Sequence, residues 1–319
     1  MADIAIIGAG MAGLTAASAL AGAGHAVRVF EKSGGLGGRL ATRRCAAGGF
    51  DHGAPGFTAA DPDFASMLAA GAKNGHTAAW PKGDRHLLSH THGPAYVGLP
   101  GASSAVRALL GGEGFGETHI ARRTEVTALA RADGRWHLSL TDGAATADTL
   151  LLAIPAPQAA RLLATAGIEE PALSAVDMTP LLSAMVAFEE PLAALATLAP
   201  PLAKALREGD KPGRSNGADR WVLHADPSWS VAHVEDDKDA IAAGLIGAFA
   251  ESAGPLPPET YRAGHRWRFA LTTRPLAQPC LWHADTRIGL CGDWCLGDTV
   301  EHAFLSGRAL AAAARESLA

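Results

Sequence analysis

The N-terminal end of the chain contains the feature that most constrains its fold. A short apolar run, Ile4-Ala5-Ile6-Ile7, is followed directly by Gly8-Ala9-Gly10-Met11-Ala12-Gly13, which has the spacing G-x-G-x-x-G. The Ala/Leu-rich stretch from Leu14 to Ala23 predicts a helix that ends at Gly24, and Ala26–Phe30 predicts a second strand. The sequence therefore predicts a β-α-β unit in which a glycine-rich turn joins the first strand to the helix.

Each glycine of this turn has its own role in binding a dinucleotide. Gly8 allows the tight turn, Gly10 lets the backbone approach a pyrophosphate, and Gly13 lets the helix pack closely on the strand. The helix N-terminus offers free N–H groups and a positive dipole end to the phosphates. Glu31 lies at the spacing where an acid accepts hydrogen bonds from ribose hydroxyls. The cofactor-binding residues predicted from this unit are Gly8, Gly10, Met11, Ala12, Gly13, Glu31 and Lys32.

A second glycine-rich loop follows at once, Ser33-Gly34-Gly35-Leu36-Gly37-Gly38-Arg39. The backbone N–H groups of Gly37 and Gly38 can approach a phosphate, and the planar guanidinium of Arg39 can bind one. A nicotinamide-dependent dehydrogenase would normally continue its winding here. The order of the two loops around the acid instead resembles the FAD-binding N-terminus of the flavin amine oxidase superfamily.

The next residues narrow this resemblance. Arg39-Leu40-Ala41-Thr42-Arg43-Arg44, with Phe50-Asp51-His52-Gly53-Ala54 and Phe57-Thr58-Ala59, is similar to the renalase family, including bacterial renalase-like proteins. The resemblance implies that Gly53 and Ala54 lie along the flavin ring and that the residues after them line the substrate face. The family usually has Gln-Tyr where this chain has Pro55-Gly56, so an amide and an aromatic ring are missing from the substrate wall.

The far end of the chain completes the resemblance. Val126 lies where the family's Thr-x-Val contacts the adenine. The strand Ile288–Cys291, then Gly292-Asp293, then the Ala-rich helix Val300–Leu318 match the superfamily's second FAD motif. Asp293 is expected at the ribityl or pyrophosphate part, and the helix N-terminus would stabilise negative charge on the ring. Cys295 is interpreted as a free thiol and the FAD as noncovalent, because the family has no covalent flavin.

The substrate side is predicted from scattered aromatic residues. His265-Arg266-Trp267 matches the family's His-Arg-Trp, although a buried aromatic ring plus an ion pair explains this tripeptide equally well. In the catalytic interpretation, His265 and Trp294 orient the reacting ring. The predicted substrate-binding residues are Phe57, Thr58, Tyr96 and Trp267.

The predicted fold class is α/β, a split Rossmann-type domain with an inserted α+β domain. Residues 1–72, 98–165 and 278–319 would form the FAD-binding domain, and residues 73–97 and 166–277 a sheet-based substrate domain. Expected helices are 61–72, 105–110, 157–166 and 237–251, and residues 73–100 are expected to be irregular. Expected strands are 118–120, 125–130, 136–140, 149–154, 181–188 and 221–224, the first four as a meander that returns to the main sheet.

Composition excludes several other classes. With 48% apolar and 18% charged residues in 319, the chain can bury a large core, and a net charge of −5 gives no electrostatic case for nucleic acid or an anionic membrane. Residues 4–24 carry no charge, but their glycines and the lack of a preceding Lys or Arg argue against a signal or spanning segment. Cys45, Cys280, Cys291 and Cys295 are interpreted as reduced thiols, and the protein is expected to be cytoplasmic.

A metal site is not expected. His86, His90 and His92 have the spacing H-x3-H-x-H, but no acidic or cysteine partner is nearby in the sequence and no helix is evident. A solvated loop is the better interpretation of these three histidines.

The renalase resemblance implies a FAD-dependent oxidase whose donor is a 2- or 6-dihydro isomer of NAD(P). A hydride would pass from the misplaced ring carbon to flavin N5, giving NAD(P)+, and O2 would reoxidise the flavin and yield H2O2. Because the donor becomes an aromatic pyridinium without losing a proton, the reaction needs little acid–base chemistry from side chains. The partners implied are a small-molecule donor and O2.

Two other functions stay open, a flavin-dependent amine oxidase and a non-catalytic flavin- or nucleotide-binding protein. Amine oxidases of this superfamily usually frame the substrate nitrogen between two aromatic rings, and commonly have a lysine near flavin N5. This chain has two tyrosines, Tyr96 and Tyr261, and neither is in the C-terminal flavin motif. A binding protein would not need a water-excluding pocket walled by aromatic rings.

Overall fold

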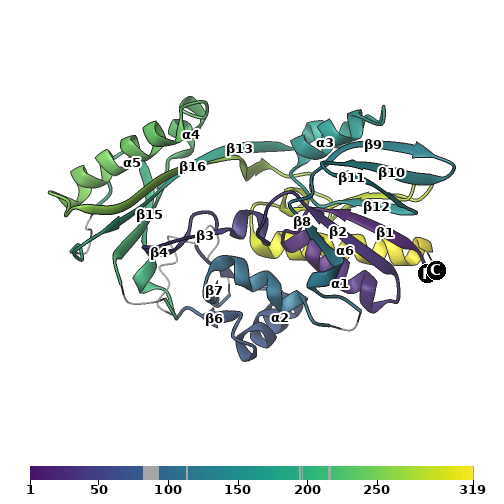
Figure 1. Ribbon diagram of the computed structural model, residues 1–319, viewed down its shortest axis with the longest axis horizontal. Coiled ribbons are helices and arrows are strands. Elements are labelled where there is room, and N and C mark those ends of the chain that lie inside the picture. The colour runs from purple at the N-terminus through teal and green to yellow at the C-terminus, as the bar shows by residue number, and fades with distance from the viewer. Residues whose placement is uncertain (82–92, 113, 194, 196, 215–216, 319) are drawn as a thin grey trace.

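A computed structural model describes residues 1–81, 93–112, 114–193, 195, 197–214 and 217–318. Two lobes lie side by side along the longest axis of the molecule, and both chain termini are at the outer end of one of them (Figure 1). His86, His90 and His92, the candidate histidine loop, lie outside the described residues. In the part of the chain that is described, no helix has the length and apolar character needed to cross a membrane.

The lobe with the termini is built on a six-stranded sheet of order β17-β18-β12-β1-β2-β8. The strands from β18 to β8 run parallel, and β17 pairs antiparallel at the edge. Their bounds are β1 Asp3–Ile7, β2 Ala26–Glu31, β8 Ile120–Arg122, β12 Thr149–Leu152, β17 Leu281–His283 and β18 Ile288–Leu290. Three distant segments of the chain therefore share one doubly covered sheet, which confirms the Rossmann-type α/β fold class.

Helices cover one face of this sheet. Ile4 and Ile6 of β1 point into a core shared with α1 (Met11–Gly22) and α6 (Val300–Leu318). The two helices cross closely, because a Cβ at Gly307 would lie 2.2 Å from the carbonyl oxygen of Ala12. The predicted C-terminal helix is confirmed, with the same bounds. Because Gly307 has no side chain, α6 can contact the backbone of α1 beside the glycine-rich turn.

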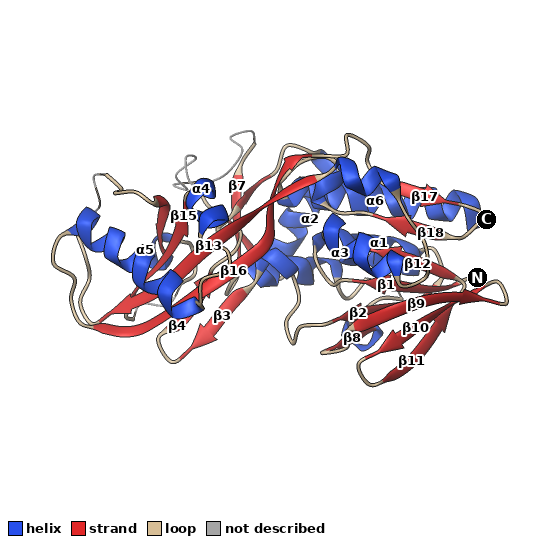
Figure 2. Ribbon diagram, turned by 90° about the horizontal axis from the view of Figure 1, so that it is seen from above, coloured by secondary structure: helices blue, strands red, loops and turns tan. Residues whose placement is uncertain are grey.

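A separate antiparallel sheet covers the other face. Alternate residues of β1, Ala5 and Ile7, pack against Trp136 and Leu138 of this second sheet and against α3 (Ala156–Ala164). The sheet contains β9 (Val126–Ala132), β10 (Arg135–Leu140) and β11 (Gly143–Ala147) (Figure 2). The expected meander therefore forms its own layer, and only β8 and β12 join the main sheet.

Three local expectations are corrected between β2 and β9. Residues 73–100 are not all irregular, because β6 (Thr77–Ala79) and β7 (Ala95–Gly98) pair with each other and with β5 (Phe57–Thr58). The expected helix 105–110 is a 3-10 helix, η3, over Ala102–Leu109, and 118–120 begins as the 3-10 turn η4, Glu117–His119. These elements are too short for periodicity to identify. The helix α2 (Pro62–Lys73) is as predicted, with Asp61 as its N-cap.

The second lobe is a four-stranded antiparallel sheet of order β14-β15-β13-β16. The bounds are β13 Asp177–Phe188, β14 Leu202–Arg207, β15 Asp219–Ala225 and β16 Glu259–Arg274. One face is covered by α4 (Pro227–Ala232) and α5 (Lys238–Ala253). Of the four strands, β14 and β16 are not predicted from the sequence, and β13 and β15 are longer than expected.

The other face of this sheet packs on a hairpin from the N-terminal region. The hairpin consists of β3 (Thr42–Cys45) and β4 (Gly48–Asp51), and Phe50 stacks on Tyr261 of β16 with ring centroids 5.2 Å apart. The long strands β13 and β16 run from this lobe toward the other one (Figure 1). The chain after Arg39 therefore supplies part of the core of both lobes.

A buried ion cluster fixes the hairpin to the second lobe. Lys211 Nζ lies 2.8 Å from Glu208 Oε1 and 3.2 Å from Asp51 Oδ2, and Arg214 pairs with the same two carboxylates. The four side chains are at most 3% exposed. Burial acts to raise the pKa of Asp51, but the cations Lys211 and Arg214 outweigh it and lower that pKa. Two acids and two bases thus neutralise one another at the junction.

Candidate functional site

A cavity of about 1090 Å³ lies where the two lobes meet. Its walls come from both glycine-rich loops, from the chain between Gly53 and Thr58, from residues 124–127 and 153–155, and from β14, β15 and β16 of the second lobe. This volume is at the upper end of the usual range for small-molecule sites, about 300–1,000 Å³. The cavity therefore spans the region predicted for a cofactor and the region predicted for a substrate.

The backbone of the first glycine-rich turn is tightly packed at two of its three glycines. A Cβ at Gly13 would lie 2.0 Å from the carbonyl oxygen of Gly8, and Gly8 itself has φ +104° with a Cβ position 2.5 Å from Ala153 O. Both positions therefore exclude any side chain because backbone is in the way. Gly10 differs, because no protein atom lies within 4 Å of its Cβ position, and this residue lines the cavity. The space beside Gly10 is open to a ligand such as a pyrophosphate.

The second loop lies directly beside the first. The N–H of Gly37 donates to the carbonyl of Ala9 at 2.9 Å, and Gly37 forms a bridge with Gly10. Gly37 and Gly38 line the cavity with φ of +103° and +56°. The N–H of Gly37 is therefore used within the protein, whereas the loop as a whole adds a second stretch of exposed backbone beside the first.

Glu31 joins the two loops. Its carboxylate accepts from Ala9 N at 2.9 Å through Oε2 and from Ser33 N at 2.8 Å through Oε1. Each carboxylate oxygen can accept a further hydrogen bond, so the residue can still bind a ribose hydroxyl. Glu31, the exposed Lys32 and the buried Val126, which the sequence analysis assigns to the cofactor, all line the cavity.

Arg39 and Asp293 form an ion pair at the cavity wall. Arg39 Nη1 lies 2.8 Å from Asp293 Oδ2, the second nitrogen pairs with Oδ1, and Nη1 also donates to Ala270 O at 2.8 Å. The sequence assigns Arg39 to a phosphate and Asp293 to the ribityl or pyrophosphate region. In the structure the charge of each is largely neutralised by the other, while Arg39 keeps 30% of its side chain exposed.

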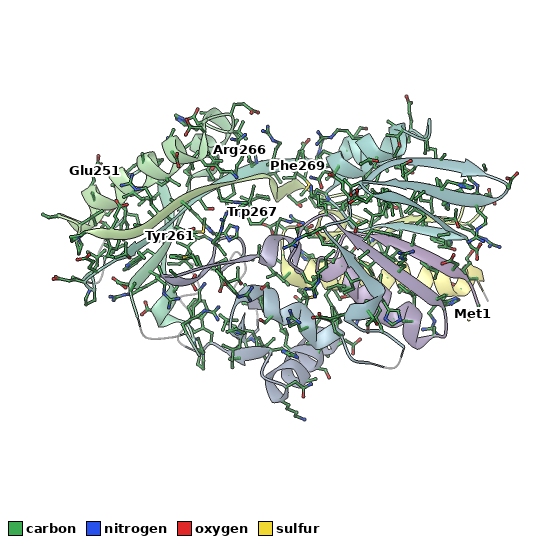
Figure 3. All side chains as sticks on the ribbon, in the orientation of Figure 1. Met1, Glu251, Tyr261, Arg266, Trp267 and Phe269 are labelled. Carbon is green, nitrogen blue, oxygen red and sulfur yellow. The ribbon has the colours of Figure 1, made fainter. Side chains whose placement is uncertain are left out.

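The chain after β4 runs along the cavity under Trp267. A Cβ at Gly53 would lie 2.0 Å from Arg39 O and 3.3 Å from the Trp267 indole, and Ala54 N donates to Arg39 O at 2.9 Å. Trp267 Nε1 donates to the carbonyl of His52 at 2.9 Å. Figure 3 shows Trp267 and Tyr261 on the same side of β16, with Arg266 on the other. The His-Arg-Trp tripeptide thus presents alternate residues to opposite faces.

Three rings form a cluster at this wall. His52 stacks on Trp267 with centroids 5.1 Å apart, and His265 lies 4.5 Å from His52 and 4.4 Å from Trp267. Burial lowers the pKa of His265 to about 3 and that of His52 to about 4. Both imidazoles are therefore neutral near pH 7 and provide hydrogen-bonding groups rather than charge.

Only some of the remaining residues predicted for the substrate side line the cavity. Phe57 and Thr58 line the cavity. Tyr96 is half-buried beside Phe57 in the small β5-β7-β6 sheet and is not among the described residues that line the cavity. Trp294 is also at the cavity wall, but it has no exposed surface, and its indole nitrogen donates to Ile154 O at 3.0 Å. Its packing indicates support of the wall rather than direct contact with a substrate.

The structure adds lining residues that the sequence analysis missed. The principal ones are Arg161, Lys204, His224 and Phe269. Arg161 lies over the Phe269 ring at 5.3 Å, and His224 is 4% exposed. No local pattern marks these residues, because Lys204, His224 and Phe269 reach the cavity through pairing of strands distant in sequence and Arg161 reaches it from α3. In the described part of the chain, no group of three or more His, Cys, Asp or Glu side chains could hold a metal ion.

Comparison with known proteins begins with a family model. The NAD(P)-binding Rossmann-like domain matches residues 6–70. This match covers the two glycine-rich loops, the acid between them and most of α2, and it agrees with the β-α-β unit of the structure.

Curated relatives match over short stretches of the chain. An L-amino-acid oxidase from Echis ocellatus is 56% identical over 48 residues, 15% of this chain and 10% of that protein. An L-amino acid oxidase from Crotalus durissus cumanensis is 61% identical over 41 residues, 13% of this chain and 8% of that protein. The chain thus matches only about a tenth of the length of these relatives.

Solved structures match over the whole chain. A protein assigned as a protoporphyrinogen oxidase from Exiguobacterium sp. 255-15 has a TM-score of 0.74 at 15% identity, covering 99% of this chain and 98% of that one. A triple mutant of putrescine oxidase gives 0.68 at 12% identity with 98% of both chains covered. Cyclohexylamine oxidase from Brevibacterium oxydans IH-35A gives 0.66 at 14% identity with 99% of both covered. The chain has the fold of these three oxidases.

Proposed function

We propose that this chain is a FAD-dependent oxidase that acts on 2- or 6-dihydro isomers of NAD(P) and passes the electrons to O2. The observation that best supports the proposal is that one cavity joins the two glycine-rich loops to the aromatic residues of β16. A cofactor and a planar donor can share such a cavity with the reacting rings face to face.

The residues of the cofactor half fit a noncovalent FAD. The open space beside Gly10 would admit the pyrophosphate, Glu31 would accept from the ribose, and Gly53 and Ala54 would lie along the ring. Burial raises the pKa of the Cys295 thiol to about 12, so this nearby sulfur is a protonated and poor nucleophile for a covalent link. The split domain of residues 1–72, 98–165 and 278–319 would hold the cofactor, and residues 73–97 and 166–277 would supply the substrate side.

Bound FAD would supply the two-electron acceptor for the donor and would return the electrons to O2 as H2O2. The chain's own residues have a simpler task, since the donor loses a hydride, becomes an aromatic pyridinium and releases no proton. Trp267 and Phe57 would exclude water and hold the ring, and His265 would orient it. His265 and His52, being neutral, are suited to positioning rather than proton transfer at neutral pH.

The charge of the cavity wall favours a phosphate-bearing donor over an amine. The cavity is lined by Arg161 from α3 and by Lys204, Arg266 and Arg268 from the second lobe, with Asp298 as the acid near Lys204. Arg266 and Arg268 pair with Glu235, which reduces but does not remove their attraction for phosphate. A protonated amine entering here would be repelled, whereas a dinucleotide would be attracted.

An amine oxidase is the second candidate, because structures of putrescine and cyclohexylamine oxidases share the fold. The two are separated by anaerobic mixing of the flavin-loaded protein with 2- and 6-dihydro-NAD(P), ordinary NADH, and primary and secondary amines. Fast bleaching of the flavin by the isomers alone is expected. Bleaching by an amine and not by the isomers assigns the protein to the amine oxidases, and no bleaching by any donor favours a non-catalytic binding protein.

Cofactor attachment has its own test. Acid precipitation is expected to leave yellow flavin in the supernatant, and flavin retained in the pellet would contradict noncovalent binding. A cytoplasmic location stays a prediction from the four cysteines, all of which are free in the structure.

A further inference from the structure

Four polar side chains form a row across the sheet of the second lobe. Ser183 on β13 is paired with His224 on β15 and with His265 on β16, and Lys204 on β14 is paired with His224. Directly paired residues on neighbouring strands project to the same face, with Cβ atoms about 5 Å apart. The row therefore lies on one face of the sheet, the face that the hairpin and His52 cover.

Three members of the row and the neighbouring His52 each have a buried polar atom with no partner in the described part of the chain. Ser183 Oγ, His224 Nε2, His265 Nδ1 and His52 Nδ1 are buried atoms without a hydrogen-bond partner among the described residues. Most buried polar groups are paired, so four such atoms in one cluster need an explanation. His224 is 96% buried and yet, with His265 and Lys204, it lines the cavity. Because the cluster lies at a cavity wall, a polar group of a bound substrate can supply the missing hydrogen-bond partner.

The histidines of the row carry no charge near neutral pH. Burial lowers the pKa of His224 to about 3, helped by the cations Lys204 and Lys211, and lowers that of His265 to about 3, helped by His52, Lys238 and Arg43. Burial also lowers the pKa of Lys204, although Asp298 opposes this shift. Asp51, the acid nearest His52, acts to raise the pKa of that imidazole but is outweighed by burial. Each neutral imidazole offers one donor and one acceptor.

The tautomer of His224 follows from its other contact. The hydrogen bond between His224 and the backbone of His52 raises the His224 pKa, which is the effect of a bond that the imidazole donates. The remaining nitrogen, Nε2, is then an acceptor. A partner for this wall must therefore donate to His224 and accept from a neighbour. A primary carboxamide does both, whereas a carboxylate only accepts and an ammonium only donates.

We propose that His224 and His265 form a subsite that binds the carboxamide of the dihydronicotinamide ring, with Ser183 and His52 as positioning residues behind them. This assignment rests on the proposed function. The amide N–H donates to His224 Nε2, and the amide oxygen accepts from His265. Ser183, which is paired with both histidines across the sheet, lies between the two imidazoles.

The test compares two probes that differ only at this group. The flavin-loaded, oxidised protein is titrated calorimetrically with NAD+ and with its deamido form, in which a carboxylate replaces the carboxamide. NAD+ is expected to bind at least tenfold more tightly. His224→Leu is expected to weaken NAD+ binding about tenfold and leave the deamido form nearly unchanged, and His224→Gln is expected to restore most of the preference. His137→Leu, at an exposed strand position, is the matched control and should change neither.

Equal binding of the two probes by the unmodified protein, tighter binding of the deamido form, or no binding of either would overturn the subsite. So would an equal loss of both probes in His224→Leu, because that result indicates a structural role alone. The proposed function is read separately, from anaerobic bleaching by the dihydro isomers. Bleaching without a carboxamide preference rejects the subsite and keeps the function, whereas failure to bleach rejects the function whatever the binding data show.

Discussion

The guanidinium of Arg39 and the carboxylate of Asp293 form a two-point ion pair between residues 254 positions apart in the sequence. Arg39 follows the second glycine-rich loop, and Asp293 follows the last parallel strand before α6. Thr272 Oγ1 adds a weak contact to the same carboxylate at 3.4 Å. The pair therefore joins the first and last segments of the lobe that contains the termini, at the wall of the cavity.

Arg39→Lys should lower both stability and FAD retention. Lysine cannot form the two-point pair, and the Asp293 side chain is only 5% exposed, so the carboxylate loses hydrogen bonds that water cannot fully replace. We expect a loss of about 2 kcal/mol in the free energy of unfolding, measured by urea denaturation. Arg135→Lys, which disturbs the exposed pair with Asp3, is the control and should cost less than about 1 kcal/mol. Equal effects of the two variants would show that the Arg39 pair has no special role.

Three glycine-to-alanine variants should separate packing from ligand binding. Gly13→Ala places a methyl group 2.0 Å from Gly8 O and should prevent stable folding. Gly10→Ala meets no protein atom, so the apoprotein should melt normally, but its FAD affinity should fall at least about tenfold because the methyl enters the phosphate approach. Gly22→Ala, also without neighbours, is the control and should stabilise slightly, by about 0.5–1 kcal/mol. Unchanged FAD affinity in Gly10→Ala would place the pyrophosphate elsewhere.

Much of the cofactor lobe is predictable because its signals are local. The turn from Gly8 to Gly13 and the Ala-rich C-terminal helix need only short-range sterics and periodicity to be recognised. The strand β16 (Glu259–Arg274) was missed, although Tyr261 and Trp267 alternate with Arg262 and Arg266 along it. One face of β16 is covered by a hairpin from residues 42–51. The alternation of aromatic and charged residues along β16 can therefore be assigned to a strand only when the position of this hairpin is known.

The residues of the candidate site also fall into two groups, those that a local sequence spacing predicts and those that only strand pairing brings together. The spacing of Gly8, Gly10, Gly13 and Glu31 is enough by itself to predict contacts with a phosphate and a ribose. His224 and Ser183 have no recognisable spacing, since strand register brings them beside His265. The pairing of Arg39 with Asp293 was also beyond the sequence, because each residue separately is a reasonable ligand for the cofactor.

Stability should fall as the pH decreases below 6.5. The pKa of His224 is lowered to about 3, so between pH 6.5 and 3 the unfolded state binds a proton that the folded state does not. Its contribution is complete above pH 6.5 and decreases by about 1.4 kcal/mol per pH unit below it. Urea denaturation of His224→Gln at pH 7.5, 6 and 5 should give a shallower slope by this amount. His137→Gln should keep the original slope, and identical slopes for both would contradict burial of a neutral His224.

Lys211→Met should be strongly destabilising. It leaves the buried carboxylates of Asp51 and Glu208 with Arg214 as their remaining cation in the cluster. Breaking a buried pair from one side costs about 3–5 kcal/mol, and adding Glu208→Gln should recover part of the loss. The exposed Arg268, paired with Glu235, provides the control Arg268→Met, with an expected cost below about 1 kcal/mol. A similar small cost for Lys211→Met would mean that solvent reaches the cluster.

The long pair β13–β16 has a consequence for how the molecule can be divided. These strands are paired from Asp177 with Arg274 to Phe188 with Glu259, so the second lobe is attached by a hydrogen-bonded ribbon rather than a flexible tether. Exchange of the second lobe between related proteins must therefore preserve strand register as well as sequence boundaries. A chimera joined one residue out of register would exchange the sheet face of Trp267 and His265 with that of Arg266, and would remove both rings from their packing with His52.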